Sequence, residues 1–204
     1  MSFASSASYG NPEFWLNAAL SCISLGLGHR LRCLWLRHLL FMIPDWQQWQ
    51  PGLRATLMFI VDETSHQVLL IRKKRGLGAG KINGPGGKMD PGETSLQCAI
   101  RETQEELGVT ALDPVKHGEL WFQFVDGLSL HVDVYRATCW EGEAIETPEA
   151  IPLWTPLSAL PFEEMWADDR FWLAEVLIEK KHFIGKFLFE GDTMLSTEIA
   201  WLEI

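Results

Sequence analysis

The chain has 204 residues, of which 47% are hydrophobic and 22% are charged, and its formal net charge is −10. This composition is typical of a soluble globular protein that needs no disulfide or structural metal to fold. The acidic balance argues against binding to duplex nucleic acid, which requires Lys and Arg to neutralise phosphates. It leaves room for a small phosphorylated substrate, because a bound divalent cation inverts the local field. The four cysteines share no metal-ligand spacing and are expected to be reduced: Cys22, Cys33, Cys98 and Cys139.

Residues 1–50 differ from the rest, with four of the ten tryptophans and only five charged residues. Their apolar stretch, residues 14–28, is short for a membrane span, and basic residues follow it rather than precede it as in a signal peptide. Two interpretations stay open. Residues 31–43 form an amphipathic helix on a membrane or on the main domain, or the first 41 residues are a poorly ordered extension. The second is favoured, so we expect an extension at 1–50 and one domain at 51–204.

The pattern becomes regular from Arg54 onward. Apolar runs and alternating segments predict strands at 55–61, 67–71, 118–125, 130–137, 150–154, 183–189 and 194–202. The first of these is apolar at every position except one threonine and is expected to be covered on both faces. The alternation around Asp133 predicts a strand with one exposed face.

Two helices are expected. Residues 93–107 form the first, which Gly108 ends as a C-cap. Residues 169–181 form the second, with Asp168 as its N-cap and lysines in the last turn. Between the second strand and the first helix, residues 76–87 hold six glycines and one proline, which predicts a loop of unusual backbone freedom. This order of elements predicts an α+β protein, a mixed β-sheet sandwiched between helices.

Three acids of the first predicted helix, Glu102, Glu105 and Glu106, stand at i, i+3 and i+4 and share one face. They repel each other and also face the negative end of the helix dipole. Magnesium or manganese among them would offset that repulsion. The alternative is a solvated acidic face, which is the commoner meaning of such a cluster. The glycine-rich loop and the pairing expected between Arg101 and Glu93, eight residues apart, favour the metal site.

Residues 87–109 resemble the signature of the Nudix hydrolase family, G-x5-E-x7-R-E-U-x-E-E-x-G-U with U apolar. Thr103 alone departs from it, in place of an aliphatic residue. The resemblance implies the Nudix fold and a magnesium-dependent hydrolase in which Arg101 orients the glutamates. Glu149 resembles a further acid of the metal site, with a surface acid as the alternative. The implied metal ligands are Gly87, Glu102, Glu105, Glu106 and Glu149.

Residues 73–80, 83–87 and 161–172 resemble the animal branch of the family, the MutT homologues, which are oxidised purine nucleoside triphosphatases. The resemblance runs from Ala55 to the C-terminus. It implies hydrolysis of 8-oxo-dGTP and 2-hydroxy-dATP to the monophosphate and pyrophosphate, which sanitises the nucleotide pool. Leu77 replaces a phenylalanine of that branch, which leaves the purine preference open. The alternatives are a Nudix hydrolase of another nucleoside diphosphate-linked substrate, or a non-catalytic nucleotide-binding module, which the intact set of glutamates disfavours.

A purine requires a flat apolar slot with hydrogen-bonding groups at its edge. Trp166 is expected to stack on the ring, while Asp168 and Asp169 bond to the edge of the base. Selection would then depend on their protonation, because a neutral carboxyl donates whereas a carboxylate only accepts. The alternatives are that Trp166 is a core residue and that Asp168 is only the helix cap. The resemblance implies this set of substrate-binding residues: Thr56, Lys73, Asn83, Phe122, Trp166, Asp168 and Asp169.

The expected chemistry is metal-assisted substitution at a phosphorus of the triphosphate chain, in which Glu105 or Glu106 accepts the proton of water. With Arg101 they are the expected catalytic residues. The basic run at 72–75 is expected to steer the anionic substrate. The expected partner is a small nucleotide, without a nucleic acid polymer and without membrane contact of the extension, and the protein is expected to be a cytoplasmic monomer.

Overall fold

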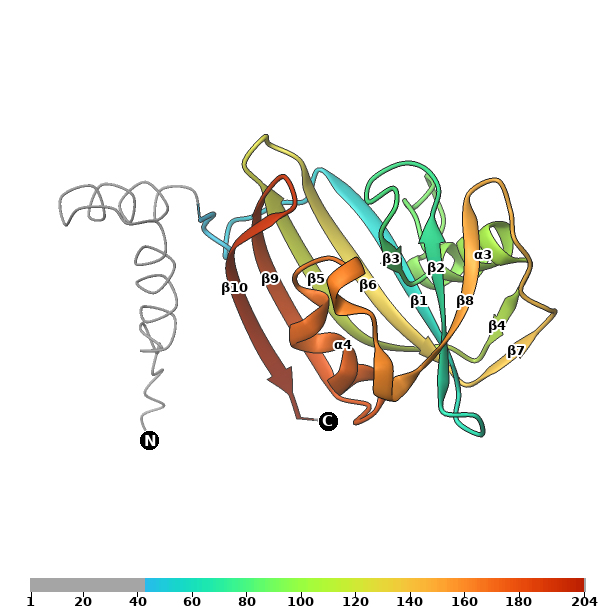
Figure 1. Cartoon of the computed structure of the whole chain (residues 1–204). Helices are drawn as coiled ribbons and strands as arrows, with labels where there is room; N and C mark the ends of the chain where they lie inside the picture. Colours follow the sequence, from blue (N-terminus) through green and yellow to red (C-terminus); the bar gives the residue numbers. More distant parts are fainter. Residues whose placement is uncertain (1–42, 204) are drawn as a thin grey trace, which may run out of the picture. The chain divides into compact units, whose positions relative to one another are not determined.

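A computed structural model of the chain describes residues 43–203 (Figure 1). The chain divides into two compact units, Met1–Asp45 and Trp46–Ile204, and the fold described here is that of the second. The extension expected over residues 1–41 and, apart from Ile43, the amphipathic helix expected over residues 31–43 lie outside the described residues.

One mixed sheet of eight strands forms the centre of the fold. Its order is β10-β9-β5-β6-β1-β2-β3, and β8 pairs with the other edge of β2. The β1–β6 and β5–β9 pairs are parallel and the others are antiparallel. The strands are β1 (Leu53–Asp62), β2 (Gln67–Lys73), β3 (Ile82–Asn83), β5 (Val115–Phe124), β6 (Ser129–Ala137), β8 (Ala150–Pro156), β9 (His182–Glu190) and β10 (Thr193–Leu202). A separate antiparallel ribbon consists of β4 (Thr110–Leu112) and β7 (Cys139–Glu141).

Two α-helices cover opposite faces of this sheet, α3 (Ser95–Leu107) and α4 (Asp169–Leu177) (Figure 1). Neighbouring residues of β1 point to opposite faces, as in any strand. Phe59 packs with Trp172 of α4, with ring centroids 5.9 Å apart, whereas Met58 belongs to the cluster that contains Ala99 of α3. The predicted α+β architecture is therefore confirmed. Two short 3-10 helices, η1 (Leu157–Ala159) and η2 (Phe162–Glu164), precede α4.

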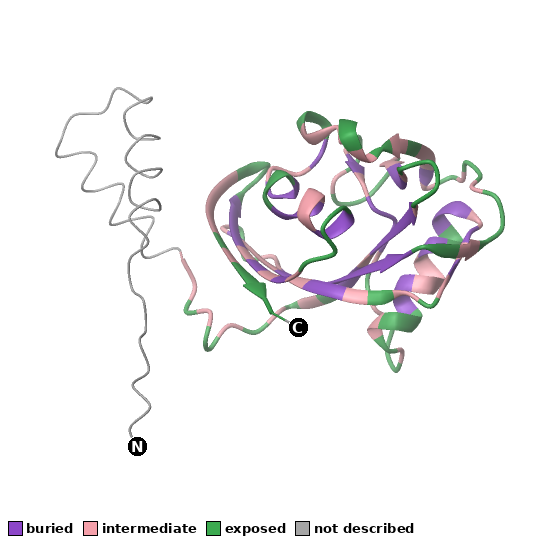
Figure 2. Ribbon diagram, turned by 90° about the horizontal axis from the view of Figure 1, so that it is seen from below, coloured by how far each residue is buried: buried purple, intermediate pink, exposed green. Residues whose placement is uncertain are grey.

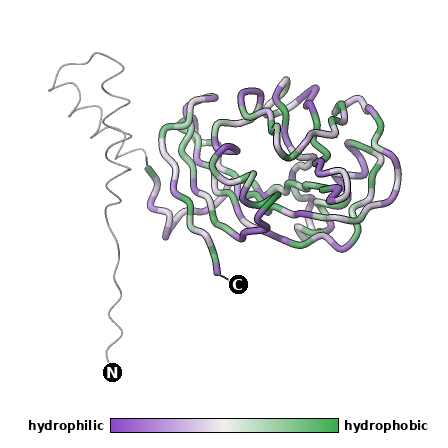
Figure 3. The backbone as a smooth tube through the Cα atoms, turned by 60° about the horizontal axis from the view of Figure 1, so that its bottom comes forward, coloured by the Kyte–Doolittle hydropathy of each residue, from purple (hydrophilic) through white to green (hydrophobic). Residues whose placement is uncertain are grey.

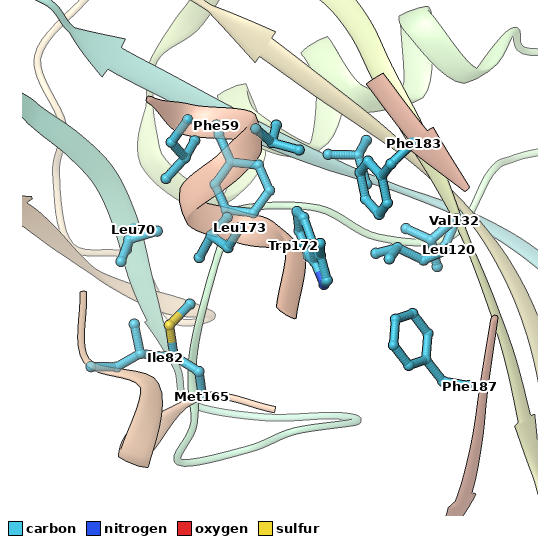
Figure 4. Packing of buried hydrophobic residues seen from close by; sticks show 14 of the residues in the cluster. Phe59, Leu70, Ile82, Leu120, Val132, Met165, Trp172, Leu173, Phe183 and Phe187 are labelled. Carbon is cyan, nitrogen blue, oxygen red and sulfur yellow. The ribbon is translucent and has the colours of Figure 1, made fainter. Parts of the chain in front are cut away.

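The larger hydrophobic core lies between the sheet and α4. Trp172 is 1% exposed and stacks on Phe183 of β9 at 5.1 Å, and Leu173 fills the space beside it (Figure 4). The central strands are buried along most of their length, while the exposed residues gather in loops and at the sheet edges (Figure 2). Hydrophobic and hydrophilic residues are interspersed along the backbone of the domain (Figure 3). No helix within residues 43–203 is long and apolar enough to cross a membrane.

The seven predicted strands are confirmed, but the exposed face predicted for β6 is wrong. Every residue from Leu130 to Ala137 is buried. The polar side chains of β6 are compensated by partners on the same face rather than by water: the Lys116 ammonium lies 2.6 Å from Asp133 Oδ1, and His131 Nε2 lies 2.9 Å from Glu119 Oε2. Alternation of polar and apolar residues cannot distinguish a solvated face from one covered by paired charges.

The second helix is shorter than predicted. It ends at Leu177, and the lysines expected in its last turn lie beyond it. Lys180 adopts a left-handed conformation with φ 56°, which a continuing α-helix does not allow. Three short strands, β3, β4 and β7, were not predicted because two or three residues carry no detectable periodicity.

Residues just before the predicted domain start pack on the sheet. The indole of Trp49 stacks on Trp121 of β5 at 5.3 Å and donates a hydrogen bond to Gln123 Oε1 at 2.9 Å. Trp46 packs edge-on against Trp49, with centroids 5.6 Å apart. These contacts cover Trp121 and Gln123 of β5.

We expect a chain that begins at residue 51 to be less stable than one that begins at residue 46, by about 1–3 kcal/mol. The reason is the loss of two half-buried indoles from the surface of β5. Denaturant unfolding of the two shortened chains measures the difference. Equal unfolding free energies would show that the tryptophan contacts contribute nothing to the domain.

Candidate active site

A cavity of about 570 Å³ opens beside β1, β5 and β6. Its walls are apolar where the strands form them and carboxylate-rich where two other segments reach it. Glu102 and Glu106 approach from α3, and Asp168 and Asp169 approach from the start of α4. The cavity therefore combines an apolar slot with two separate pairs of acids.

The α3 side of the cavity depends on a gap in the sheet. β1 pairs with β2 only over Ile60–Asp62, which leaves the first half of that β1 edge without a strand partner. The glycine-rich loop takes this place: the amide of Thr56 donates to the Gly87 carbonyl, and that of Met58 to the Pro85 carbonyl, both at 2.9 Å. The loop backbone thereby lies against α3.

The ends of α3 are set by local hydrogen bonds. Thr94 is the N-cap, and its hydroxyl and the Gln97 side chain form a capping box. Gly108 ends the helix in a left-handed conformation with φ 73°, as predicted. Glu93 thus precedes the helix instead of starting it, and it is free to fold back toward Arg101.

Arg101 connects the acids of the signature. Its Nη2 donates to Glu93 Oε1 at 2.7 Å and its Nε to Glu93 Oε2 at 3.1 Å, so the predicted pair is confirmed. Its Nη1 donates to Glu102 at 2.9 Å and to Glu105 at 3.1 Å. The hydrogen bonds from Arg101 lower the pKa of Glu93 to about 2. One guanidinium therefore orients three carboxylates.

Glu102 and Glu106 are held close to the glycine loop. Glu106 is 2% exposed, and its carboxylate accepts from the Gly86 amide at 2.9 Å and lies 3.3 Å from the Lys73 ammonium. A Cβ atom added at Gly87 would overlap the carboxylate of Glu102, so only glycine allows this approach. Burial raises the pKa of both glutamates. Buried oxygen ligands of this kind, next to a backbone carbonyl, fit a hard divalent cation.

Glu105 and Glu149 occupy different positions from those two acids. The Glu105 side chain is 58% exposed, bonds to Arg101 and does not line the cavity. Glu149, just before β8, does line the cavity and forms an ion pair with Arg75. The helical spacing placed three acids together, but the structure brings two of them into the cavity and leaves the third at its margin.

The basic run at 72–75 is neutralised by glutamates. Besides Lys73 with Glu106 and Arg75 with Glu149, Arg72 pairs with Glu164 at 2.6 Å, and Lys74 pairs with Glu146. Two members of the run, Lys73 and Arg75, line the cavity, so the expected role in steering the anionic substrate stays a prediction. The ion pairs also tie β2 to α3, to the segment before β8 and to η2.

The α4 side of the cavity carries two adjacent buried carboxyls. Asp168 Oδ2 accepts from Trp172 Nε1 at 3.0 Å, and Asp169 Oδ2 accepts from the Trp166 amide at 3.1 Å. Burial raises the pKa of Asp168 to about 6, and burial together with the neighbouring Asp168 raises that of Asp169 well above its usual range. Asp168 Oδ1 is buried without a hydrogen-bond partner among residues 43–203. Asp168 is the N-cap residue of α4, as predicted, but its side chain makes no capping hydrogen bond and bonds to the Trp172 indole.

The remaining predicted substrate residues all border the cavity. Thr56 does so although its hydroxyl bonds to Cys98 Sγ at 3.3 Å, and Asn83 does so while its Oδ1 accepts from the Gly84 amide at 2.8 Å. The full set on the cavity wall is Thr56, Lys73, Asn83, Phe122, Trp166, Asp168 and Asp169. Apolar wall residues that sequence reasoning missed are Leu57, Leu120, Phe124, Leu130 and Val132. Alternation along β5 from Phe122 would have identified Leu120 and Phe124.

Among the described residues, one further group has the composition of a cation site: Glu119, His131 and Asp133. It lies on strands β5 and β6 and is not part of the cavity wall. The Lys116 ammonium is 2.6 Å from both Glu119 and Asp133 and so provides positive charge to the two carboxylates. This cluster is thus internally compensated.

A sequence profile described as the NUDIX domain matches residues 52–176. The oxidized purine nucleoside triphosphate hydrolase of Danio rerio is 43% identical over 141 residues, which cover 69% of this chain and 88% of that protein. The enzyme of the same name from Mus musculus is 42% identical over 132 residues, covering 64% and 84%. A crystal structure of a MutT protein from Bacillus halodurans superposes with a TM-score of 0.64 at 31% identity, covering 72% of this chain and 97% of that one.

We expect magnesium to raise the melting temperature of the protein, and the rise to shrink as the pH falls from about 8 to about 5. Burial raises the pKa of Glu102 and Glu106, so they take up protons at a higher pH than ordinary glutamates, and protons compete with the metal. Thermal unfolding with and without magnesium measures the effect. In Glu106→Gln the rise should be lost, and an undiminished rise in that variant would contradict the assignment.

Proposed function

This chain belongs to the Nudix hydrolase family, and from that premise we propose that it hydrolyses oxidised purine nucleoside triphosphates. The proposed substrates, 8-oxo-dGTP and 2-hydroxy-dATP, would be cleaved to the monophosphate and pyrophosphate with a divalent cation as cofactor. One observation carries the proposal: a single cavity holds Glu102 and Glu106 of the signature and the buried pair Asp168 and Asp169 beside Trp166. The names of the animal relatives support the same substrate class. The acidic net charge of the protein favours a free nucleotide over a nucleic acid polymer.

The α3 side of the cavity is the proposed site of magnesium or manganese. Gly87, Glu102, Glu106 and Glu149 would hold the ion, with Glu105 at the margin. When bound, the ion supplies positive charge that offsets the charge developing on the phosphate oxygens. The residues fit this role because the two carboxylates line one cavity next to the Gly87 backbone: Glu106, which is 2% exposed, bonds to the Gly86 amide and Lys73, and Glu102 pairs with Arg101.

Glu106 is the proposed proton acceptor for the attacking water. Its burial raises the pKa toward the pH at which the enzyme works, which makes a carboxylate a better base. Its hydrogen bond from Gly86 and its contact with Lys73 keep the carboxylate in one orientation. Glu105, largely exposed and bound to Arg101, is the weaker candidate. Arg101 positions Glu102 and Glu93 and so keeps these acids next to the glycine-rich loop.

The α4 side of the cavity is the proposed base pocket, with Trp166 stacking on the purine. Burial raises the pKa of both aspartates, and the neighbouring Asp168 raises that of Asp169 further. In this proposal Asp169 keeps its proton and donates, while Asp168 accepts. Oxidation changes the donors and acceptors at a purine edge. A pair with one donor and one acceptor distinguishes the two forms.

We expect Glu106→Gln to lower kcat on 8-oxo-dGTP by at least about 10²-fold while the protein remains folded. The amide keeps the size of the side chain and its hydrogen bond from Gly86 but loses the charge and the basicity. Product analysis should show monophosphate and pyrophosphate for the unaltered protein. Glu63→Gln, an exposed substitution at the end of β1, serves as a control and should retain full activity.

Retained turnover in Glu106→Gln would remove the catalytic assignment. Release of inorganic phosphate instead of pyrophosphate would refute the proposed bond cleavage. A preference for dGTP over 8-oxo-dGTP would refute the proposed substrate and indicate a Nudix hydrolase that acts on a different one.

We expect kcat/KM for 8-oxo-dGTP to fall at alkaline pH, as the carboxyl of Asp169 loses its proton and its ability to donate. Because burial and Asp168 raise this pKa, the fall should occur well above the range of an ordinary aspartate. Asp169→Asn, whose amide donates at every pH, should lack the fall. If the pH profile of Asp169→Asn matches that of the unaltered protein, a group other than Asp169 causes the fall.

A further inference from the structure

Lys81, the residue before β3, contacts the proposed base pocket without lining it. Its ammonium lies 5.0 Å from the ring centroid of Trp166 and 3.0 Å from Oδ2 of Asp192, in the turn between β9 and β10. Trp166 belongs to the cavity wall, whereas Lys81 does not. The cation therefore contacts the indole from outside the cavity.

We propose that Lys81 is a positioning residue for base recognition, which fixes the indole of Trp166 and supplies positive charge near Asp169. Asp192 holds the ammonium in place. The proposal rests on the proposed function, because it takes Trp166 and Asp169 as the groups that contact the purine.

Besides Lys81, the ring of Trp166 has two aromatic neighbours and one loop against it. Phe124 and Phe189 meet its ring edge-on, at centroid distances of 6.2 Å and 5.7 Å. A Cβ atom added at Gly78 would come within 3.0 Å of the indole nitrogen, so the loop before β3 lies against the ring edge. The Lys81 ammonium provides the electrostatic contact with the ring, which is strongest over the face of an indole.

The position of Lys81 is set by the backbone of its loop. The Lys81 amide donates to the Gly78 carbonyl at 2.9 Å, and the Lys73 amide of β2 donates to the Lys81 carbonyl at 3.0 Å. Arg72 Nη1 donates to the Gly80 carbonyl at 3.0 Å. These bonds fix the loop to β2, so the side chain starts from a defined point and reaches both Trp166 and Asp192.

Lys81 also belongs to the electrostatic surroundings of Asp169. Charged groups act on this carboxyl from two elements: Asp168 from the start of α4, and Lys81 from the loop before β3. The negative charge of Asp168 raises the pKa of Asp169, and the positive charge of Lys81 lowers it. Removal of the cation should therefore leave Asp169 protonated to a higher pH.

The chain contains a matched control on the other side of the sheet. Lys186 of β9 lies 5.6 Å from the ring centroid of Trp121 and 2.9 Å from Glu198, and its side chain is 22% exposed against 24% for Lys81. Lys186→Met removes the same charge and the same kind of contact. Neither Lys186 nor Trp121 borders the cavity.

The test compares Lys81→Met, Lys81→Arg and Lys186→Met in steady-state kinetics on 8-oxo-dGTP across pH. We expect Lys81→Met to raise KM about three- to tenfold with kcat within about twofold, and to move the alkaline fall of kcat/KM to higher pH. Lys81→Arg should restore both values, and Lys186→Met should change neither. An unchanged KM and pH profile in Lys81→Met overturns the proposal, as does an equal change in Lys186→Met.

A second measurement does not depend on turnover. Carbon-13 NMR of labelled aspartate carboxyls, with the Asp169 signal assigned by Asp169→Asn, follows its titration without nucleotide. We expect Lys81→Met to shift this titration upward and Lys186→Met to leave it in place. If the unaltered protein fails to hydrolyse any oxidised purine nucleotide, the proposed function fails, but this titration still decides whether Lys81 acts on Asp169. An unchanged titration in Lys81→Met overturns the proposed effect of Lys81 on Asp169.

Discussion

The burial of carboxylates around one cavity is the constraint on which the rest of this structure depends. Glu106 on one side and Asp169 on the other are almost fully buried, and burial alone disfavours their charged forms. Each is compensated differently. Glu106 has a backbone amide and the Lys73 ammonium, whereas burial and the neighbouring Asp168 raise the pKa of Asp169 well above its usual range. The surroundings of Glu106 suit a divalent cation, and those of Asp169 suit recognition of the hydrogen-bonding edge of a base.

The sheet lies between the two pairs of acids, and both pairs line the same cavity. β1 parts from β2 after a short pairing, and the glycine-rich loop fills the opening, which brings backbone groups to the acids of α3. On the other face α4 is fixed by Trp172, whose indole packs in the core and donates to Asp168. The same side chain therefore stabilises the fold and orients an acid of the proposed base pocket.

Ion pairs join several segments of this acidic protein. The four basic residues of the run at 72–75 all face glutamates, and Asp133 in the centre of β6 faces Lys116. Such pairs contribute little energy when exposed, but they fix the loops that carry them. In this chain two of the pairs, Lys73 with Glu106 and Arg75 with Glu149, lie on the cavity wall.

Features that depend on local chemistry could be predicted from the sequence. The C-terminal Gly108 of α3, the Glu93–Arg101 pair and the strand pattern follow from rules that act over a few residues. Which side chains meet depended on the packing of distant segments. The fold left Glu105 outside the cavity, paired the basic run, buried β6 and turned the side chain of the N-cap residue Asp168 to an indole. These outcomes depend on contacts between residues distant in the chain, where packing and burial override local preference.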